Sequence, residues 1–307
     1  MNAKAAGFDA GLSIAAVERA AGLSKDTLRA WERRYGFPQP VRDEAGERLY
    51  PAEQVHKLHL LKRLVERGGR PGRLVRLDSA ALEALVGEGS ESQPRSAATD
   101  GFLDLIRSHD VQALRRLLRQ RRSRLGPARF VTEVVAPLNT LVGDGWMRGH
   151  LQVFEEHLYT ESLQIVLRET ITALSRGRAA DRPLVLLTTL PGEPHGLGLL
   201  MAEAMLWLEG ARCVSLGTLT PLWDIVLAAQ SQACDIVALS FSGCMNPNQV
   251  VDGLSELRAR LPAAATLWAG GSAPVLHRRG VPGVRAIAAL SQIGAELQRW
   301  RQSAARP

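Results

Sequence analysis

The sequence predicts an α plus α/β chain in three parts: a small basic helical module with a β-hairpin, a bundle of four helices, and a doubly wound parallel sheet of five strands. Short arginine-rich helical patterns occupy residues 11–86, and longer amphipathic helical patterns occupy residues 99–178. Short apolar runs then alternate with helical patterns over residues 182–303, which is typical of a parallel sheet. A stretch containing Gly, Ser and Pro at residues 87–98 indicates a linker.

Composition narrows the class of protein. With 307 residues and 46% hydrophobic residues the chain has enough apolar material for packed cores, which excludes a disordered or fibrous protein. No stretch reaches the ~20 apolar residues that a membrane span needs, and the N-terminus lacks the apolar region of a secretory signal. Cys213, Cys234 and Cys244 have no metal-ligand spacing and are expected to be reduced thiols. We therefore expect a cytoplasmic protein without a membrane partner.

Charge is concentrated at one end of the chain. Residues 1–77 hold 15 Lys and Arg against 9 Asp and Glu, which accounts for +6 of the net charge of +7. A basic segment on a nearly neutral remainder is typical of a nucleic-acid-binding module. On the charge alone, a basic surface that faces only solvent is as good an explanation as a nucleic-acid-binding module.

The first module reads as a helix-turn-helix followed by a wing. A short helix over Ser13–Ala20 is followed by a turn at Gly22, and Ser24 is placed to cap a second helix over Lys25–Tyr35. The second helix of such a pair fits the major groove of DNA. It offers hydrogen-bond donors to phosphates and base edges at Lys25, Thr27, Arg29, Arg33 and Arg34. The next segment predicts a β-hairpin that ends in Arg48 and Tyr50.

Residues 11–77 resemble the MerR family of winged-helix transcription regulators, through SIAAVERAAGLSKDTLRAWERRYGFP and the later RLY. The resemblance implies double-stranded DNA as partner, contacted by Arg29, Arg33, Arg34, Arg48 and Tyr50. Leu28, Trp31 and Tyr35 are interpreted as core. MerR regulators usually dimerise through a long helix, but here the helix near Glu53–Arg67 ends at Gly68-Gly69 and no heptad run follows. Self-association is therefore expected from the C-terminal part.

The sheet is predicted from its apolar runs. The strand candidates are Leu184–Leu190, Ala211–Gly217, Asp235–Ser242, Ala265–Gly271 and a weaker Val284–Leu290. Helical patterns between them cover Leu197–Leu208, Pro221–Gln232 and Pro247–Leu261. Ligands of such sheets bind beyond the carboxyl ends of the strands.

The loop after the first of these strands is the candidate site. It holds Glu193, His195 and Gly198, and a carboxylate two residues before a histidine can fix one ring nitrogen while the other binds a metal. On the residues alone, His195 is a ligand or acid–base group, or simply an exposed loop histidine. Neither GxGxxG nor GxxxxGK[ST] follows the strand, so NAD and NTP fingerprints are excluded.

Glu193-x-His195-x-x-Gly198, Ser240-Phe-Ser242 and Gly270-Gly271 together resemble the flavodoxin-like cobalamin-binding domain. The family pattern has Asp where Glu193 stands and usually Leu where Ser242 stands. The resemblance implies that His195 is the lower ligand of cobalt. It also implies that the displaced nucleotide tail runs beside Ser240, Ser242, Gly270 and Gly271, with Gly198 permitting close approach of the ligand.

The helical bundle carries a second signature. Trp146, nine further residues and then Glu156-His157 resemble the W-x9-EH motif of the CarH/LitR type of MerR regulators, in which the bundle caps the upper face of adenosylcobalamin. Ten residues of one continuous helix span ~15 Å, which is too far for Trp146 and Glu156 to contact the same small group. The helix must therefore break between them, and Gly149 lies at a position where it can do so. Light-sensing members have a histidine after the tryptophan, and this chain has Met147.

These resemblances imply a cytoplasmic transcriptional repressor that is not an enzyme. Its adenosylcobalamin-bound oligomer, expected to be a tetramer, would hold operator DNA and dissociate when light breaks the Co–C bond. Two alternatives remain open from sequence. One is a light-independent, cobalamin-sensing regulator of the same architecture, and the other is a corrinoid methyl-carrier module.

Overall fold

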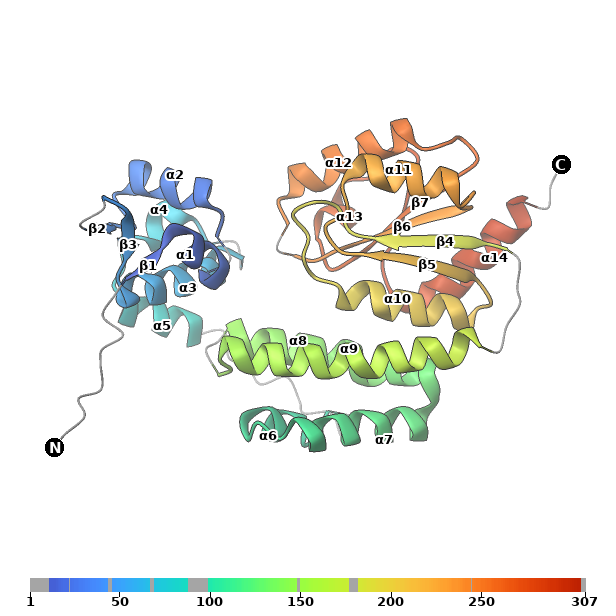
Figure 1. Ribbon diagram of the computed structural model, residues 1–307, viewed down its shortest axis with the longest axis horizontal. Coiled ribbons are helices and arrows are strands. Elements are labelled where there is room, and N and C mark those ends of the chain that lie inside the picture. The colour runs from blue at the N-terminus through green and yellow to red at the C-terminus, as the bar shows by residue number, and fades with distance from the viewer. Residues whose placement is uncertain are drawn as a thin grey trace. The chain divides into compact units, whose positions relative to one another are not determined.

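The computed structural model describes residues 11–21, 23–43, 46–66, 69–87, 99–147, 150–176, 182–243 and 245–304 (Figure 1). The chain divides into two compact units: residues 1–94 with 145–150, and residues 95–144 with 151–307. Most of the expected linker at 87–98, together with Gly22, Gly149 and Cys244, lies outside the described residues.

The first unit contains the expected helix-turn-helix and wing. Its helices are α1 (Ile14–Ala21), α2 (Lys25–Tyr35), α3 (Ala52–Glu66), α4 (Pro71–Leu74) and α5 (Ser79–Gly87). A small antiparallel sheet of order β1-β3-β2 is formed by β1 (Leu12–Ser13), β2 (Val41–Arg42) and β3 (Arg48–Tyr50). Ser24 caps α2 as predicted, because its Oγ accepts a hydrogen bond from the Thr27 N–H at 3.1 Å. Gly36 ends that helix with a φ of 69°.

The core of the first unit explains the apolar positions of its helices. Val17, Leu28, Leu58 and Leu82 are fully buried and come from α1, α2, α3 and α5. The interpretation of Leu28 and Trp31 as core residues is confirmed. Helix α3 ends at Glu66, close to the predicted end, so the described part of this unit has no helix longer than the 15 residues of α3.

The second unit begins with the helical bundle. Its elements are α6 (Phe102–Arg107), α7 (Val111–Arg129), the π-helix η1 (Phe130–Val135), α8 (Ala136–Met147) and α9 (Val153–Ser175). The fully buried Leu114, Leu118, Leu163 and Val166 lie on α7 and α9, which pack together. Arg119 also bridges these helices, donating from Nη2 to Glu169 Oε1 at 2.6 Å. The predicted break between Trp146 and Glu156 is present, since α8 ends at Met147 and α9 begins at Val153.

The predicted five-stranded parallel sheet completes this unit, with strand order β5-β4-β6-β7-β8 in the described residues. The strands are β4 (Leu184–Thr188), β5 (Arg212–Gly217), β6 (Ile236–Phe241), β7 (Thr266–Gly271) and β8 (Val284–Ile287). The helices between and after them are α10 (Leu197–Leu208), α11 (Leu222–Ser231), α12 (Pro247–Arg260), α13 (Val275–Arg278), η2 (Leu290–Gln292) and α14 (Ile293–Ala304). Helices α11 and α12 cover one face of the sheet, while α10 and α14 cover the other (Figure 1).

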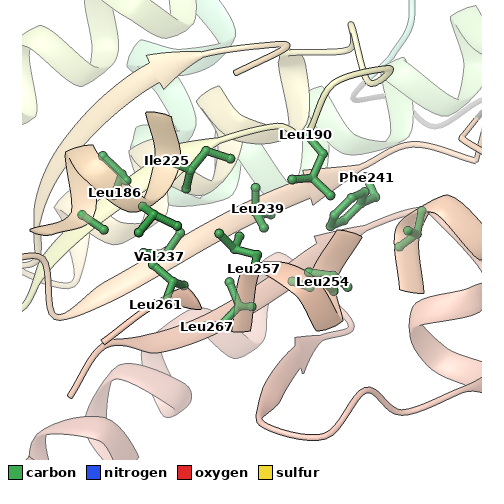
Figure 2. Close-up of a cluster of buried hydrophobic side chains, with 14 of the residues drawn as sticks. Leu186, Leu190, Ile225, Val237, Leu239, Phe241, Leu254, Leu257, Leu261 and Leu267 are labelled. Carbon is green, nitrogen blue, oxygen red and sulfur yellow. The ribbon is translucent and has the colours of Figure 1, made fainter. Parts of the chain in front are cut away.

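The sheet is held by an apolar layer beneath α11 and α12. Leu186, Val237 and Leu267 project from β4, β6 and β7 toward Ile225 of α11 and Leu257 of α12 (Figure 2). All five side chains are fully buried. Burial of this kind stabilises a fold by about 1.5–3 kcal/mol per large side chain. This rigid layer supports the carboxyl ends of the strands, where the candidate site lies.

Candidate cofactor site and DNA-binding surface

The candidate cofactor site is built on the loop between β4 and α10. Thr189, at the start of this loop, donates its hydroxyl to the Glu193 carbonyl oxygen at 2.6 Å. The Glu193 N–H in turn donates to the Leu190 carbonyl oxygen at 3.1 Å. These bonds close the loop into a tight turn and direct the Glu193 side chain inward, where it is 1% exposed.

Glu193 ties His195 to the end of β6. Its Oε1 lies 2.6 Å from His195 Nδ1 and accepts the His195 backbone N–H at 3.1 Å. Its Oε2 accepts the Ser242 N–H at 2.6 Å, and the Ser242 hydroxyl donates to the same oxygen at 2.8 Å. Ser242 Oγ also lies 3.1 Å from His195 Nδ1. The predicted partners Glu193, His195 and Ser242 are thus brought together.

The electrostatics of this cluster fix the form of the imidazole. Burial raises the pKa of the Glu193 carboxyl, but hydrogen bonds from His195 and Ser242 outweigh it and leave the pKa below its ordinary value. An ionised Glu193 only accepts hydrogen bonds, so the proton of a neutral His195 ring lies on Nδ1. The lone pair then lies on Nε2, the nitrogen that a metal would take. The ring is open to solvent, with 56% of the His195 side chain exposed.

A cavity of about 670 Å³ opens beside this histidine. It lies between the sheet, α10 and the segment from Ala288 to Ile293, with η1 and α8 on its remaining side. Six of the predicted cofactor residues line it: His195, Gly198, Ser240, Ser242, Gly270 and Gly271. Its other walls are mostly apolar, as in sites for large organic cofactors.

Two glycines that line the cavity also allow close approach of neighbouring segments. A Cβ at Gly198 would lie 2.4 Å from Ser240 Oγ, so this glycine lets α10 pack against β6. Gly198 also lines the cavity, and its role in admitting a ligand stays a prediction. Gly271 has a φ of 113°, and a Cβ there would lie 2.1 Å from the Phe241 carbonyl oxygen.

The structure adds cavity residues that sequence reasoning missed. Asn139 of α8 accepts a hydrogen bond from the buried Tyr159 hydroxyl and donates to Met201 Sδ at 3.3 Å. Asn139, Met201 and Trp268 all line the cavity. The sequence held one signal for this residue. Asn139 is an amide within the apolar helical segment from Ala136 to Leu141, and amide side chains are seldom found in a core.

The three residues of the W-x9-EH signature do not line the cavity within the described residues. Trp146 groups with the first unit, where the Arg63 guanidinium lies 5.0 Å from the centre of its ring. Glu156 and His157 lie in the first turn of α9, with Glu156 Oε2 and His157 Nδ1 3.0 Å apart. The Thr160 hydroxyl donates to Glu156 Oε1 at 2.6 Å.

The predicted DNA-contacting residues lie along α2 and the wing. Arg29, Arg33 and Arg34 are exposed on α2, and the Arg34 guanidinium lies 5.5 Å from the Tyr35 ring centre. Lys25 is paired with Glu18 at 3.7 Å, and Arg48 is paired with Glu32 at 3.8 Å. Thr27 Oγ1 lies 2.8 Å from Ser24 Oγ, so it belongs to the helix cap.

Tyr50 does not fit the predicted role. Its side chain is fully buried in the core of the first unit, and burial raises the pKa of its hydroxyl. A buried ring cannot press on the sugar-phosphate backbone, so the prediction that Tyr50 contacts DNA is wrong for this conformation. Tyr50 is the last residue of β3, where it pairs with Leu12 of β1, and its ring packs in the core of the first unit.

Family models match two parts of the chain. Residues 12–77 match "MerR HTH family regulatory protein", and residues 98–169 match "B12 binding domain". The second match lies on the helical bundle, beside the cavity.

Curated relatives cover most of the chain. The transcriptional repressor CarH of Myxococcus xanthus is 32% identical over 265 residues, which are 84% of this chain and 88% of CarH. The chain belongs to the MerR family of transcriptional regulators, in the CarH/LitR type. The repressor CarA of the same organism is 30% identical over 82% of this chain and 84% of its own length. The protein is accordingly a regulator and not an enzyme.

A solved structure agrees on the fold. The monomethylamine corrinoid protein of Methanosarcina barkeri matches with a TM-score of 0.53 at 18% identity, over 66% of this chain and 98% of its own. The bundle and the parallel sheet together therefore have the fold of that protein. No helix in the described part of the chain is long and apolar enough to cross a bilayer.

Proposed function

We propose that this chain is a cobalamin-dependent, light-responsive transcriptional repressor that works in the cytoplasm as a homo-oligomer, a tetramer, on operator DNA. The observation that carries the proposal is the imidazole of His195 at the mouth of a cavity of about 670 Å³, held at Nδ1 by the buried Glu193. The match of residues 98–169 to the B12 binding domain supports the same ligand.

The residues present fit this cofactor. His195 Nε2 would bind the cobalt, while Glu193 and Ser242 hold the ring in the required tautomer. The slot for the nucleotide tail would be bordered by small residues that line the cavity on β7 and on or just after β6, namely Ser240, Ser242, Gly270 and Gly271. Adenosylcobalamin would supply a Co–C bond that light can break.

The bundle is proposed to recognise the adenosyl group. Trp146 would cover it with an aromatic face, while Glu156 and His157 would offer polar groups. Thr160 holds Glu156 from one turn further along α9. Loss of the adenosyl group would remove these contacts, and the oligomer would then lose its preference for the DNA-binding assembly.

DNA recognition is assigned to the first unit. Arg29, Arg33 and Arg34 would reach phosphates or base edges from α2, with Lys25 and Thr27 at the start of that helix. Arg48 would contact a phosphate from the wing. To contact DNA, Lys25 and Arg48 would have to be released at least in part from Glu18 and Glu32.

One experiment tests the proposal as a whole. The full chain is reconstituted with adenosylcobalamin in darkness and then illuminated, and its absorbance, its mass in solution and its operator binding are followed. We expect a bound corrinoid spectrum, a large dark assembly that binds operator, and loss of both mass and DNA binding in light. An unchanged mass would contradict light control and leave a light-independent cobalamin sensor. Methyl transfer to a thiol acceptor would instead favour the methyl-carrier alternative.

A further inference from the structure

Helix α7 concentrates positive charge in the second unit. Its 19 residues include seven arginines and no aspartate or glutamate. The arginines are Arg115, Arg116, Arg119, Arg121, Arg122, Arg124 and Arg129. Elsewhere, residues 99–307 hold 15 Lys and Arg against 18 Asp and Glu. A single helix therefore makes this part of the chain basic, while the remainder is slightly acidic.

These arginines lie at the surface of the bundle. Helix α7 forms its outer layer, on the side of α9 away from the sheet (Figure 1). The arginines from Arg115 to Arg124 precede the kink at Gly126, so they project from one regular helix. Arg116 and Arg124 are exposed, and so is Gln120 between them. We name as the α7 arginine face the side formed by Arg115, Arg116, Arg119, Arg122 and Arg124.

Few carboxylates balance the α7 arginine face. Arg119 donates two hydrogen bonds to Glu169 of α9, at 3.0 and 2.6 Å, and Arg122 Nη1 lies 3.7 Å from the same carboxylate. The hydrogen bonds from Arg119, together with the charges of Arg122 and Arg115, lower the pKa of the Glu169 carboxyl. One carboxylate thus faces three guanidinium groups. Arg116 and Arg124 form no ion pair with any residue in the described part of the chain.

The excess of like charge works against the helix itself. Like charges three or four residues apart on a helix repel each other, and Arg115, Arg119 and Arg122 follow this spacing. The helix dipole favours cations only in the last turn, whereas these arginines begin in the second turn of α7. Bound anions would remove the repulsion, so the charge pattern favours a ligand that is itself strongly negative.

The exposed side of α7 indicates which kind of anion it fits. All of α7 is described, and none of its exposed side chains is large and apolar. The centre of a protein–protein interface is built from apolar and aromatic residues, so an acidic protein would find no such centre here. Phosphate needs only charge and hydrogen-bond donors, which arginine supplies. From Arg115 to Arg124 the helix rises ~14 Å, and duplex DNA presents about eight phosphate charges over that length.

Duplex DNA is also the polyanion that this chain brings close. The first unit holds the MerR-type helix-turn-helix, and residues 87–98 join it to the second unit. A contact made by the second unit to DNA that the first unit already holds is intramolecular, so even weak phosphate contacts add to the affinity. Contacts to phosphate carry no sequence information. The face would therefore act on whatever sequence lies beside the operator.

We propose that the α7 arginine face is a second DNA-binding surface, independent of sequence, which holds the phosphate backbone of duplex DNA beside the operator. Arg116 and Arg124 contact phosphates directly. Arg119 and Arg122 stay on Glu169 and add to the positive potential of the face. The helix-turn-helix reads the sequence, and the bundle adds affinity and salt dependence. This role does not depend on the identity of the cofactor.

The test uses the full chain without cofactor and a labelled DNA duplex of arbitrary sequence. The α7 variant carries Arg116→Gln and Arg124→Gln, because glutamine removes the charge and keeps a high helix propensity. The control variant carries Arg278→Gln and Arg279→Gln, which remove the same charge from exposed positions at the end of α13. Fluorescence anisotropy measures binding over a range of salt concentrations. We expect the slope of log K against log salt to fall by about 1.8 in the α7 variant, at about 0.9 for each lost contact, and to stay unchanged in the control.

Thermal unfolding without DNA and titration with polyglutamate complete the experiment. The α7 variant should be at least as stable as the wild type, because repulsion between arginines is reduced. The proposal is overturned if the α7 variant keeps the wild-type slope, or if the control variant loses as much slope as the α7 variant. Weaker binding of polyglutamate with unchanged binding of DNA would assign the face to an acidic protein. A lower melting temperature with an unchanged slope would assign the arginines to the fold, and either result also overturns the proposal.

Discussion

The carboxylate of Glu193 holds His195 at two points, the ring Nδ1 at 2.6 Å and the backbone N–H at 3.1 Å. One buried side chain therefore fixes both the position of the loop and the direction of the imidazole. Ser242 completes the arrangement from the neighbouring strand by donating to the same carboxylate. The exposed nitrogen of His195 is oriented before any ligand arrives, which lowers the entropy cost of binding.

Replacement of His195 by alanine should weaken cobalamin binding by at least about tenfold, because the proposed lower ligand is lost. The substitution also removes one hydrogen bond from the buried Glu193 carboxylate, whose bonds from Ser242 and from the backbone N–H of residue 195 remain, so the fold should persist with a modest fall in melting temperature. Titration followed by absorbance measures the affinity. His277→Ala is the control, since His277 is an exposed histidine on α13. Equal affinities in the two variants would show that His195 is not a ligand.

Trp146→Ala should leave binding of hydroxocobalamin unchanged and remove the preference for adenosylcobalamin. The reason is that only the adenosyl form offers a group for the ring to cover. Competition titrations with both cobalamins measure the preference. Trp146→Phe keeps an aromatic ring and should retain part of the preference for adenosylcobalamin. The same alanine substitution also removes the ring beneath Arg63, so the stability of the first unit must be measured in parallel.

Arg48→Ala should weaken operator binding and flatten its salt dependence. Loss of one phosphate contact lowers the slope of log K against log salt by about 0.9. Binding is measured between low and moderate salt on a fixed operator duplex. Arg278→Ala removes an exposed arginine from α13 of the second unit and should leave the slope unchanged. An unaltered slope for Arg48→Ala would assign that residue to its ion pair with Glu32 instead.

Glu296→Gln should destabilise the protein at neutral pH and have little effect in acid. Hydrogen bonds from Arg285 lower the pKa of the buried Glu296 carboxyl, and the charge of Arg299 adds to the effect. A carboxyl whose pKa is lower in the folded state stabilises the fold above its unfolded pKa, and the contribution is lost as the pH falls through the folded value. Urea unfolding at pH 7 and near pH 3 should give a difference of about 2 kcal/mol that shrinks in acid. A difference independent of pH would contradict the ion pair.

Local patterns were sufficient to predict much of the fold. Five apolar runs between helical patterns identified the strands of the parallel sheet in the described residues, most clearly β4, β6 and β7, whose mostly buried side chains leave unbroken apolar segments. Ser24 was predicted as the cap of α2 because a helix cap is a local interaction, here a hydrogen bond from the Thr27 N–H three positions further along the chain. Glu193 and His195 were grouped because they share the loop at the carboxyl end of the first strand, and Ser242 was added by the resemblance to the cobalamin-binding domain.

Features that depend on distant contacts were not predicted. Tyr50 was assigned to DNA from its place after Arg48, but the pairing of β3 with β1 turns its ring into the core. The packing role of Gly198 was not predicted, because the space beside it is used by Ser240 from another strand. Asn139 was missed because its cavity contacts come from Met201 and Tyr159, more than fifteen residues away along the chain.

The backbone at Gly271 limits how this cavity can be redesigned. Any side chain at that position would collide with the Phe241 carbonyl oxygen and would need an unfavourable φ of 113°. Attempts to adapt the receptor to artificial corrinoids by mutagenesis should therefore leave this corner unaltered. Variation is better directed to Trp268 and Asn139, which line the same cavity from β7 and α8 at positions without a positive φ.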